Sequence, residues 1–579
     1  MWFQIDVGLA DGVQKAAESC DIFPSDFSPD VRQADSRFGD FQANGILPYA
    51  KSQGVNPRQI AEKIANKLQE DENFSGKIDV SIAGPGFINF KLSNAFFAKW
   101  INTYKSAKDY KLVLGSNFSG KRIVIDYSSP NTAKQMHVGH LRSMNIGNAI
   151  CRILKFFGAD VIGDNHIGDW GTQFGILIMA IKNENLDAST LSLEEVESLY
   201  QLGNTMIKND ESAIATARNE LVKLQNGDQE NLGIWETINA ISQQSFSEIY
   251  EEMGIAFDHT LGESFYRDKI DVVCGELVEK NIAVESDGAL CVFHREHERF
   301  NEQPFIVRKS DGASNYATTD LATVLYRTEK WRADGIIYVT DGRQQDHFQQ
   351  LFLTVQKWYS AFGRICPQME HVWFGTILGE DGKAIKTRSG SPVKLMDLIS
   401  EAKSRALGIV GEKSTSLGEM EKQRVAKVLA IDSIKYVDLL SNRTSDYVFS
   451  WEKMLSFDGN TAAYLLYTIA RIKSILGKCD LDLNAVSVDI LETEEEKNLV
   501  RRLTYFPMIL SQAVKELRPH HICTYLFQLA GEYSAFYNSN RVLEVPENIT
   551  SRRLAIILRV LAVLETGMHL LGLETLERM

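Results

Sequence analysis

The spacing of apolar positions changes several times along the chain, and the first change sets off an N-terminal module. Residues 57–69 carry apolar positions three and four apart, which predicts an amphipathic helix. Residues 78–92 favour two strands, because their short apolar runs are divided by the turn residues Gly84-Pro85-Gly86. Residues 1–110 are therefore expected to form a small α+β domain.

A different pattern follows this module. Short β-branched runs at 122–127, 160–162 and 335–339 alternate with long amphipathic stretches. This alternation predicts a doubly wound parallel sheet with helices on its faces, over residues 111–375. Residues 186–261 lie inside this range and are charged and helical in period nearly throughout, which indicates a helical insertion.

The rest of the chain has helical period. Residues 376–458 are expected to connect the sheet domain to an α-helical bundle over residues 459–579. The predicted fold class is therefore α/β, with a doubly wound parallel sheet, a helical insertion, an N-terminal α+β domain and a C-terminal α-helical bundle. Apolar residues spaced three and four apart mark the main helices of this region at 462–476, 499–517, 522–537 and 553–571.

Composition adds limits to this picture. The 579 residues are 44% hydrophobic and 24% charged, which is enough for several domains that each bury a core. We expect a cytoplasmic protein without a membrane association, because the sequence shows neither an apolar run of transmembrane length nor a signal-like start. The seven cysteines include no Cys-x-x-Cys pair and favour neither a disulfide framework nor a zinc site. The net charge of −14 is weak evidence against a nucleic-acid partner, since local basic faces can still bind one.

Residues 128–140, called the signature segment below, contain the most informative motif. The segment follows a predicted strand and precedes a helical pattern that begins near Leu141. A helix N-terminus offers unpaired N–H groups, Gly139 allows a ligand close to the backbone, and His137 and His140 can both face that ligand. We interpret the segment as a phosphate site for a nucleotide. The alternative is a solvated loop with two incidental histidines.

A second motif is the glycine-punctuated loop at residues 375–390, which carries Lys383, Lys386 and Arg388. Three cations within six residues could neutralise the charge that develops on phosphates during a transfer reaction. The alternative is a solvated hairpin. After the second predicted strand, His166 and Asp169 could be mistaken for metal ligands, but no third ligand lies near them in the sequence, so we expect no zinc or other protein-bound metal.

The signature segment resembles the HIGH-type motif of class I aminoacyl-tRNA synthetases. Pro130-Asn131 within it and Leu141-Arg142-Ser143 after it resemble the arginyl-tRNA synthetase version, and the resemblance extends over essentially the whole chain. It implies a Rossmann-like catalytic domain that uses ATP with Mg²⁺ to form arginyl-adenylate and then transfers arginine to tRNA(Arg). We expect the enzyme to be a monomer.

The resemblance also implies roles for the residues near the phosphates. His137, Gly139, His140, His347 and Lys386 would bind ATP. The catalytic set would be His137, His140, Lys134, Lys383, Lys386 and Arg388. Lys134 enters because residues 386–390 depart from the family's Lys-Met-Ser-Lys-Ser pattern and lack its second lysine. A solvated side chain is the alternative for Lys134.

A third group of residues concerns the amino acid. Tyr316 and Asp320 share one face of a predicted helix, and Asp126 ends the strand before the signature segment. A guanidinium is a planar group with five donors, so a site that selects it needs carboxylates in fork geometry. The alternative for Tyr316 and Asp320 is a plain helix-surface pair. The arginine-binding residues implied by the resemblance are Asp126, where the family often has glutamate, and Asn131, His137, Tyr316, Asp320 and Gln344.

The remaining expectations concern tRNA. In the N-terminal module an aromatic beside amides could stack on a base and read its edge, with core packing as the alternative. In the helical bundle, basic side chains could contact phosphates. The alternative for Tyr464 is a place in the core. The residues that we expect to bind tRNA are Phe41, Gln42 and Asn44 in the module, and Arg443, Tyr464, Arg471 and Arg541 in the bundle.

Two other functions are compatible with parts of the pattern. One is a synthetase-like tRNA-binding protein that has lost catalysis, although the intact His137-Val138-Gly139-His140 argues against it. The other is a class I synthetase for a different amino acid, such as cysteine. Cysteine enzymes need a metal-binding thiolate site, which the sequence does not provide.

Overall fold

The computed structural model describes residues 1–22, 27–35, 37–310, 315–385, 392–414 and 417–579. These residues form two compact units. The first unit combines Met1–Ser116 with Ser456–Met579, and the second is Asn117–Leu455. The N-terminal and C-terminal segments of the chain thus share one unit, and the finer domain boundaries expected at residues 110, 375 and 458 stay predictions.

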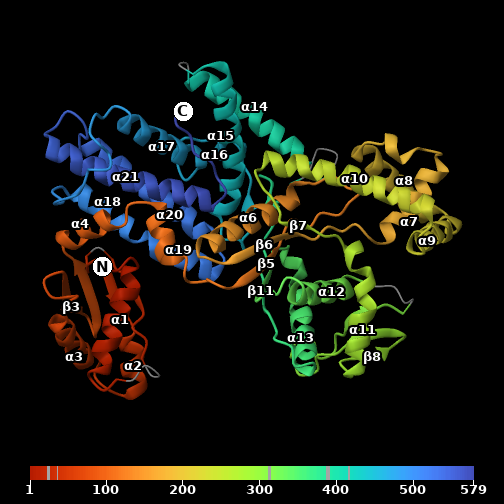
Figure 1. Ribbon diagram of the computed structural model, residues 1–579, viewed down its shortest axis with the longest axis horizontal. Coiled ribbons are helices and arrows are strands. Elements are labelled where there is room, and N and C mark those ends of the chain that lie inside the picture. Colours follow the sequence, from red (N-terminus) through yellow and green to blue (C-terminus); the bar gives the residue numbers. More distant parts are fainter. Residues whose placement is uncertain (23–26, 36, 311–314, 386–391, 415–416) are drawn as a thin grey trace. The chain divides into compact units, whose positions relative to one another are not determined.

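The N-terminal part of the first unit is built on a four-stranded antiparallel sheet of order β1-β2-β4-β3. Its helices cover the face that carries Phe41 and Phe90, which are both buried. Asn56 and Ser93 cap helices α3 and α4 through their side chains. The elements are α1 (Ile5–Glu18), β1 (Val31–Gln33), β2 (Phe41–Ala43), α2 (Ile46–Gln53), α3 (Pro57–Glu70), β3 (Ile78–Ala83), β4 (Phe87–Leu92), α4 (Asn94–Thr103) and α5 (Ala107–Leu114) (Figure 1).

The C-terminal part of the first unit is a helical bundle. The first turn of its helix α18 is acidic, and Thr493 and Glu496 close that turn with a capping box. The pattern of apolar residues three and four apart becomes the buried side of each long helix. The helices are α17 (Ala462–Leu476), α18 (Glu494–Thr504), α19 (Phe506–Glu516), α20 (His520–Ser539) and α21 (Glu547–Leu570).

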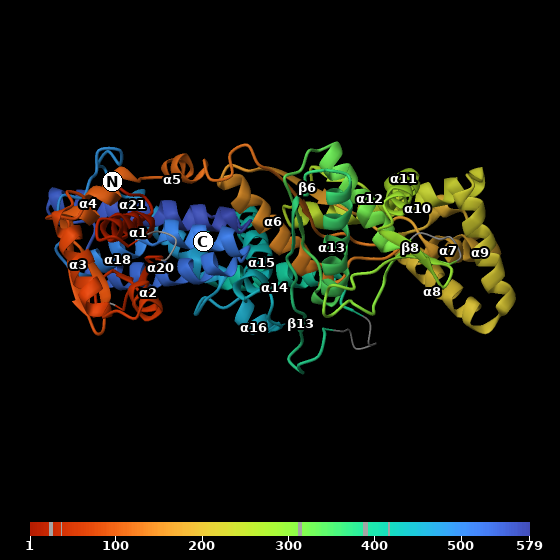
Figure 2. The same cartoon turned by 90° about the horizontal axis from the view of Figure 1, so that it is seen from below.

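The second unit is centred on a five-stranded parallel sheet of order β12-β11-β5-β6-β7. The inner strands are apolar almost without alternation, as strands covered on both faces must be. Helices α12 and α13 lie beside the sheet and share a core with β11 (Figure 2). The elements of the sheet layer are β5 (Arg122–Asp126), α6 (Leu141–Phe156), β6 (Asp160–Asn165), β7 (His259–Thr260), α11 (Ile270–Glu279), α12 (Tyr316–Glu329), β11 (Gly335–Tyr338), α13 (Gln345–Ala361) and β12 (Gln368–His371).

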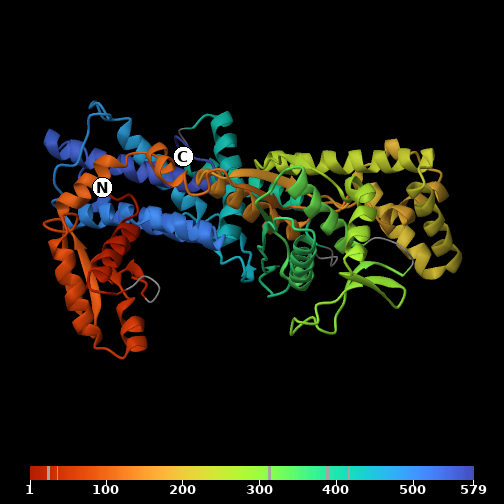
Figure 3. The same cartoon turned by 60° about the horizontal axis from the view of Figure 1, so that its bottom comes forward.

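Three additions complete the second unit. Helices α7 (Thr172–Asn183), α8 (Leu193–Asn209), α9 (Glu211–Gln225) and α10 (Gln229–Glu252) gather into one helical group with a core of its own (yellow in Figure 3). A small antiparallel sheet consists of β8 (Ala283–Ser286), β9 (Ala289–Val292) and β10 (Phe305–Arg308), which the sequence pattern did not predict. The last part comprises β13 (Ile377–Leu378), α14 (Leu395–Lys413), α15 (Glu419–Leu440), β14 (Tyr447–Val448) and α16 (Trp451–Met454).

The predicted fold class is confirmed in its three main parts: the parallel sheet, the N-terminal α+β part and the helical bundle. Within the part of the chain that the structure describes, none of the helices has the length and apolar character needed to span a membrane. The site described next lies at the carboxyl edge of the parallel sheet, where ligands bind in folds of this type.

Candidate active site

The signature segment joins β5 to α6 through a strained turn. Ser128, Ser129 and Ala133 have positive φ angles of 73°, 49° and 66°, a conformation that side-chain-bearing residues rarely adopt. Hydrogen bonds hold this backbone: Ser128 N donates to Ser143 Oγ at 2.8 Å, and Ser129 N donates to Asn165 Oδ1 at 3.1 Å. The surrounding fold therefore fixes the turn in place before any ligand binds.

The two imidazoles of the signature segment lie close together at the start of α6, with ring centroids 4.2 Å apart and ring planes tilted by 45°. The backbone N–H of Gly139 donates to His137 Nδ1 at 3.0 Å, and the N–H of His137 donates to His140 Nδ1 at 3.1 Å. A Cβ at position 139 would lie 2.8 Å from the His137 ring, so this packing needs glycine. His137 Nδ1 acts as an acceptor, which places the proton of that neutral ring on Nε2. His140 Nδ1 also lies 3.2 Å from the carbonyl oxygen of His137, so it can accept from the N–H or donate to the carbonyl, according to its tautomer.

Both rings are held in the neutral form. Burial first, and then the charges of His137 and Lys134, lower the pKa of His140 to about 4. Burial also lowers the pKa of His137, with a second contribution from Lys134. Neutral histidines with Nε2–H groups are hydrogen-bond donors that add no charge of their own. Lys134 is exposed, and its Nζ lies 5.3 Å from the centre of the Tyr200 ring. It supplies positive charge beside the two imidazoles.

The segment after the glycine-punctuated loop returns to the signature segment. Val138 N donates to Val393 O at 3.0 Å, and Leu395 N donates to Met136 O at 2.9 Å. At the first residue of the loop, Gly375 O accepts a hydrogen bond from the buried guanidinium of Arg142 at 2.8 Å. Both ends of this stretch are therefore attached to the signature segment and to α6. Lys383 is exposed at the tip of a turn, whereas Lys386 and Arg388 lie outside the described residues.

The predicted pair Tyr316 and Asp320 lies in the first turns of α12. Asn315 caps this helix, and Tyr316 is 69% exposed. His347 Nε2 lies 2.6 Å from Asp320 Oδ2. Burial alone would lower the pKa of His347, but the hydrogen bond and charge of Asp320 outweigh burial and raise that pKa. His347, which the sequence assigned to ATP, therefore contacts the carboxylate that we expected to bind arginine.

A carboxylate that the sequence reasoning missed lies beside this pair. Glu263 follows β7, and burial together with the charges of Asp320 and Asp169 raises its pKa to about 8. Asp169 is fixed by Ser264, whose N–H and Oγ donate to it at 2.9 and 2.6 Å. The only local signal for Glu263 was its place after a strand, and β7 is two residues long, too short for a hydrophobic pattern to reveal it.

Asp126 lies at the end of β5 as predicted, but its partner is a residue of the chain itself. The carboxylate is buried, and its Oδ2 accepts a hydrogen bond from Arg327 Nη2 at 2.6 Å. Asp126 Oδ1 accepts a hydrogen bond from Ser129 Oγ at 2.9 Å. Arg327 also bonds to Asp164 on the neighbouring strand β6. The sequence offered no sign of this pairing, because the partners are 201 residues apart.

Asn131 and Gln344 lie at the rim of the same edge. Asn131 pairs with Gly168 in an isolated bridge, and a Cβ on Gly168 would lie 1.9 Å from Asn131 Oδ1. Gln344 is exposed in the short 3-10 helix Gly342–Gln344 that precedes α13. The structure thus gathers Tyr316, Asp320 and Glu263 into one group, and His137, His140 and Lys134 into another.

The first unit holds most of the residues expected to bind tRNA, and it corrects one of them. Phe41 is 1% exposed and packs edge-on against Tyr505, with ring centroids 5.4 Å apart, so it belongs to the core and offers no face to a base. Gln42 points to the other face of the sheet and donates to Asn89 Oδ1 at 2.7 Å. Asn44 donates to Asp30 O at 3.3 Å and belongs to a local turn.

The bundle presents a cation between two aromatic rings. The Arg471 guanidinium lies 4.7 Å from the ring of Tyr467 and 5.1 Å from the ring of Tyr537, and both rings are partly exposed. Tyr464 lies next to Ser534, with the two hydroxyl oxygens 3.1 Å apart, and Arg541 is exposed.

Arg443 is a second correction among the residues expected to bind tRNA. It lies in the second unit rather than in the bundle, where its side chain is buried and donates to Trp373 O at 2.7 Å. Its guanidinium therefore supports the chain next to Gly375 and offers no surface to a phosphate.

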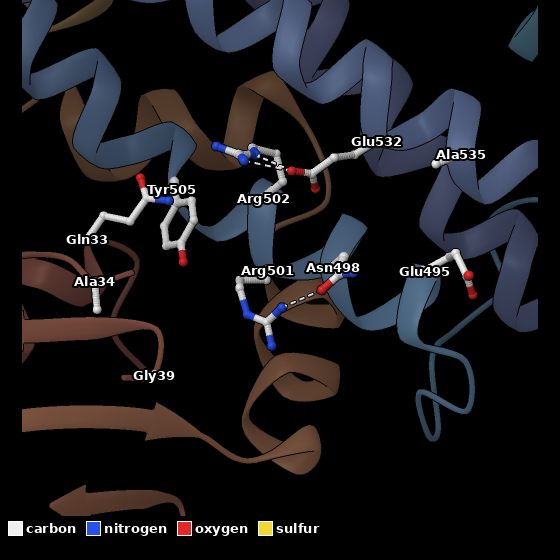
Figure 4. Close-up of a pocket in the computed structure, with 10 residues that line it drawn as sticks. All are labelled: Gln33, Ala34, Gly39, Glu495, Asn498, Arg501, Arg502, Tyr505, Glu532 and Ala535. Carbon is white, nitrogen blue, oxygen red and sulfur yellow. Dashed lines mark hydrogen bonds and ion pairs between the residues drawn. The ribbon is translucent and has the colours of Figure 1, made fainter. Parts of the chain in front are cut away.

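A cavity of about 260 Å³ lies within the first unit, between the N-terminal hairpin and helices α18 and α20 (Figure 4). Its arginines are paired: Arg501 with Asp40 and Asn498, and Arg502 with Glu532. Balanced charges of this kind suit a polar group with both donors and acceptors better than a bare phosphate. The lining consists of Gln33, Ala34, Gly39, Glu495, Asn498, Arg501, Arg502, Tyr505, Glu532 and Ala535.

Comparison with known families agrees with this geometry. The family model described as "tRNA synthetases class I (R), catalytic domain" matches residues 108–451, which contain the parallel sheet and the signature segment. The chain therefore has the catalytic domain of a class I aminoacyl-tRNA synthetase. The models described as "Arginyl tRNA synthetase N terminal domain" and "DALR anticodon binding domain" match residues 8–92 and 465–579.

Whole-chain relatives narrow this class to one family. The chain is 40% identical to an arginine–tRNA ligase of Marinomonas sp. (strain MWYL1) over 95% of both chains, and 40% identical to one of Actinobacillus succinogenes over 99% of this chain and 97% of the relative. It is similar to the crystal structure of arginyl-tRNA synthetase from Plasmodium falciparum, with 29% identity, a TM-score of 0.85 and coverage of 100% and 99% of the two chains. The chain belongs to the arginyl-tRNA synthetase family, which confirms the expectation from the signature segment.

Proposed function

We propose that this chain activates arginine with ATP and transfers it to the terminal ribose of tRNA(Arg), using the two residue groups at the carboxyl edge of the parallel sheet. The observation that carries the proposal is the arrangement of these groups. Neutral His137 and His140 lie at the start of α6, which follows β5, while Asp320 and Glu263 lie at the start of α12 and after β7. In a parallel sheet these positions meet at one edge, so a phosphate site and a cation site face the same space.

The phosphate side would act by hydrogen bonding and charge stabilisation. His137 would donate its Nε2–H to a phosphate oxygen, and His140 would do the same in its Nε2–H tautomer. Gly139 would admit the nucleotide close to the backbone. Lys134 and Lys383 would stabilise the charge on the α-phosphate and the departing pyrophosphate. Lys386 and Arg388 stay proposed members of this group on the strength of the sequence.

Mg²⁺ would arrive with ATP, bound to its phosphates. Among the described residues, histidine, cysteine, aspartate and glutamate do not gather in threes into a group that could hold a metal ion. A magnesium ion held mainly by substrate phosphates fits such a donor set, since Mg²⁺ often takes few protein ligands. No covalent enzyme intermediate is required, because in-line positioning carries the attack of the arginine carboxylate on the α-phosphate.

The arginine side would select the guanidinium through its carboxylates. Asp320 and Glu263 supply two carboxylates beside the hydroxyl of Tyr316, and both carboxylates raise the pKa of that hydroxyl, which supports their closeness to it. A guanidinium would offset the burial and the carboxylate repulsion that together keep Glu263 protonated. Asn131, His137 and Gln344 would contact the polar end of the substrate. Asp126, which is bonded to Arg327, would support the floor of this pocket without contacting the guanidinium, and His347 would orient Asp320.

Transfer RNA would contact the two parts of the first unit separately. In the N-terminal part, the amides of Gln42 and Asn44 are our proposed contacts. In the bundle, Arg471 with its flanking tyrosines would stack on an unpaired base, because aromatic and guanidinium faces both accept a base. Tyr464 and Arg541 complete this proposed surface. We further propose that the chain acts as a monomer in the cytoplasm, where its substrates meet during translation.

ATP–pyrophosphate exchange across all twenty amino acids, with and without tRNA, tests the proposal. We expect exchange with arginine alone. Exchange with another amino acid would identify a different class I specificity. Binding of tRNA(Arg) without any exchange or aminoacylation would identify a tRNA-binding protein that has lost catalysis.

A further inference from the structure

A buried arginine of α12, the helix that carries Asp320, contacts the strand that leads into the signature segment. Arg327 is fully buried and follows Asp320 by seven residues, which places the two side chains on the same side of the helix, two turns apart. Its Nη2 donates to Asp126 Oδ2 at 2.6 Å and to Asp164 Oδ2 at 2.7 Å. The ring of Tyr338 lies 5.5 Å from its Cζ atom. One guanidinium therefore holds α12 against the carboxyl ends of both β5 and β6.

The contact continues from Asp126 into the signature segment. The second oxygen of this carboxylate, Oδ1, accepts a hydrogen bond from Ser129 Oγ at 2.9 Å. Ser129 has a φ of 49°, a conformation that needs support from its surroundings. An uninterrupted series of polar contacts thus runs from Arg327 through Asp126 to the strained turn that precedes His137 and His140.

Charge gives this arrangement a second consequence. Asp126 and Asp164 lie at the floor of the carboxyl edge, near the carboxylates proposed to bind the substrate. Without a cation between them, they would form a competing site for a guanidinium, because paired carboxylates attract that group strongly. Arg327 contacts one oxygen of each carboxylate and places its positive charge between them, so Asp320 and Glu263 are the acidic groups available to the substrate.

We propose that Arg327 is a positioning residue for arginine activation. It sets the position of α12, which carries Asp320, relative to the signature segment, and it keeps the substrate guanidinium away from Asp126 and Asp164. The inference rests on the proposed function, because Asp320 and the signature segment are its two ends. Arg327 itself contacts neither substrate.

A purely structural ion pair is the alternative, since breaking a buried pair destabilises any protein. The two roles differ in kinetics. Loss of stability alone reduces the amount of active enzyme and leaves both KM values unchanged. Loss of positioning raises the KM for arginine and lowers kcat, because the amino acid and the α-phosphate no longer meet in the productive geometry.

The experiment measures ATP–pyrophosphate exchange in the presence of tRNA, together with Tm, for the unaltered chain and three variants. Arg327→Lys retains the charge, but its ammonium ends one bond short of the Nη2 position that contacts both carboxylates. We expect it to raise the KM for arginine and to lower kcat by roughly tenfold or more each, with the KM for ATP within ~2-fold.

The other two variants separate positioning from stability. Asp164→Asn removes one buried carboxylate of the cluster without touching the bond to Ser129, so we expect it to lower Tm with a much smaller change in kcat. Ser129→Ala removes only the last contact of the series at a half-buried hydroxyl. We expect it to lower kcat by roughly tenfold with a smaller loss of Tm than Asp164→Asn shows, because one positioning hydrogen bond is lost.

The outcomes decide between the two roles. If Arg327→Lys and Asp164→Asn lose kcat in proportion to Tm with both KM values unchanged, the residue is structural and the proposal is wrong. If Arg327→Lys fails to fold, Ser129→Ala decides, and parental kinetics in that variant overturn the proposal. If the unaltered chain shows no arginine-dependent exchange, the proposed function and this inference are refuted together. If the unaltered chain shows exchange and Ser129→Ala has the same kinetics, only this inference is refuted.

Discussion

Arginine binding should release a proton from Glu263. The pKa of this carboxyl is raised to about 8 by burial first and by Asp320 and Asp169 next, so that at pH 7 it is protonated in roughly nine molecules of ten. A guanidinium between Glu263 and Asp320 favours the ionised form and brings the pKa well below 7. Close to one proton should therefore leave for each arginine bound at pH 7.

The same linkage sets the pH dependence of affinity. Because only the ionised carboxylate pairs with the substrate, the dissociation constant for arginine should rise by roughly 10²-fold as the pH falls from 8.5 to 6. Four groups surround Glu263 or share its carboxylate partner: Asp320 and Tyr316 on α12, Asp169 after β6, and His347 on α13, which is bonded to Asp320.

Titration calorimetry in buffers of different ionisation enthalpy measures both quantities. Glu263→Gln is the matched control, since glutamine keeps the shape and cannot ionise. We expect the variant to bind arginine with little pH dependence, more weakly than the unaltered chain at pH 8.5 by roughly 10-fold to 10²-fold, and equally at pH 6. Proton release near zero in the unaltered chain, or the same release in Glu263→Gln, would refute this reasoning.

The other predictions concern the remaining groups of the site. His140→Ala should slow adenylate formation in single turnovers by at least ~10²-fold with tRNA binding intact, because preorganised donors to the transition state are lost; parental rates would contradict the assignment. Asp320→Asn should weaken arginine binding by ~10²-fold or more while the KM for ATP hardly moves, and equal losses for both substrates would indicate a folding defect instead. Lys134→Ala should lower kcat for adenylate formation far more than it raises either KM, and Lys386→Ala is the comparison. If Lys134→Ala has parental kinetics while Lys386→Ala is impaired, Lys134 is a solvated side chain without a catalytic role.

Features encoded by neighbouring residues could be predicted from the sequence. The alternation of β-branched runs with amphipathic stretches predicted the parallel sheet, and the start of α6 at Leu141 followed from the signature segment. The spacing of Tyr316 and Asp320 placed both on one helix, which is now α12. Each of these inferences depends on residues within a few turns of one another.

Features that depend on distant partners could not be predicted. The pairing of Asp126 with Arg327 joins the end of one strand to a helix two hundred residues later, and Glu263 reaches the site after a strand of two residues. Phe41 looked suited to a base because its sequence neighbours are polar, yet the bundle that covers it comes from the other end of the chain. In each case the tertiary contact, which leaves no periodic trace, decides the role.

The composition of the first unit has a consequence for the order in which the protein forms during synthesis. Its N-terminal part buries Asp40 and Phe41 against Arg501 and Tyr505, more than 450 residues later. At ~5–20 residues per second, a ribosome needs roughly 17 to 68 seconds to make the intervening 117–455 unit. During that interval the nascent N-terminal part exposes the surface that the bundle will later cover. The second unit is continuous in sequence and can fold first. The first unit can close only once its last helices have left the ribosome.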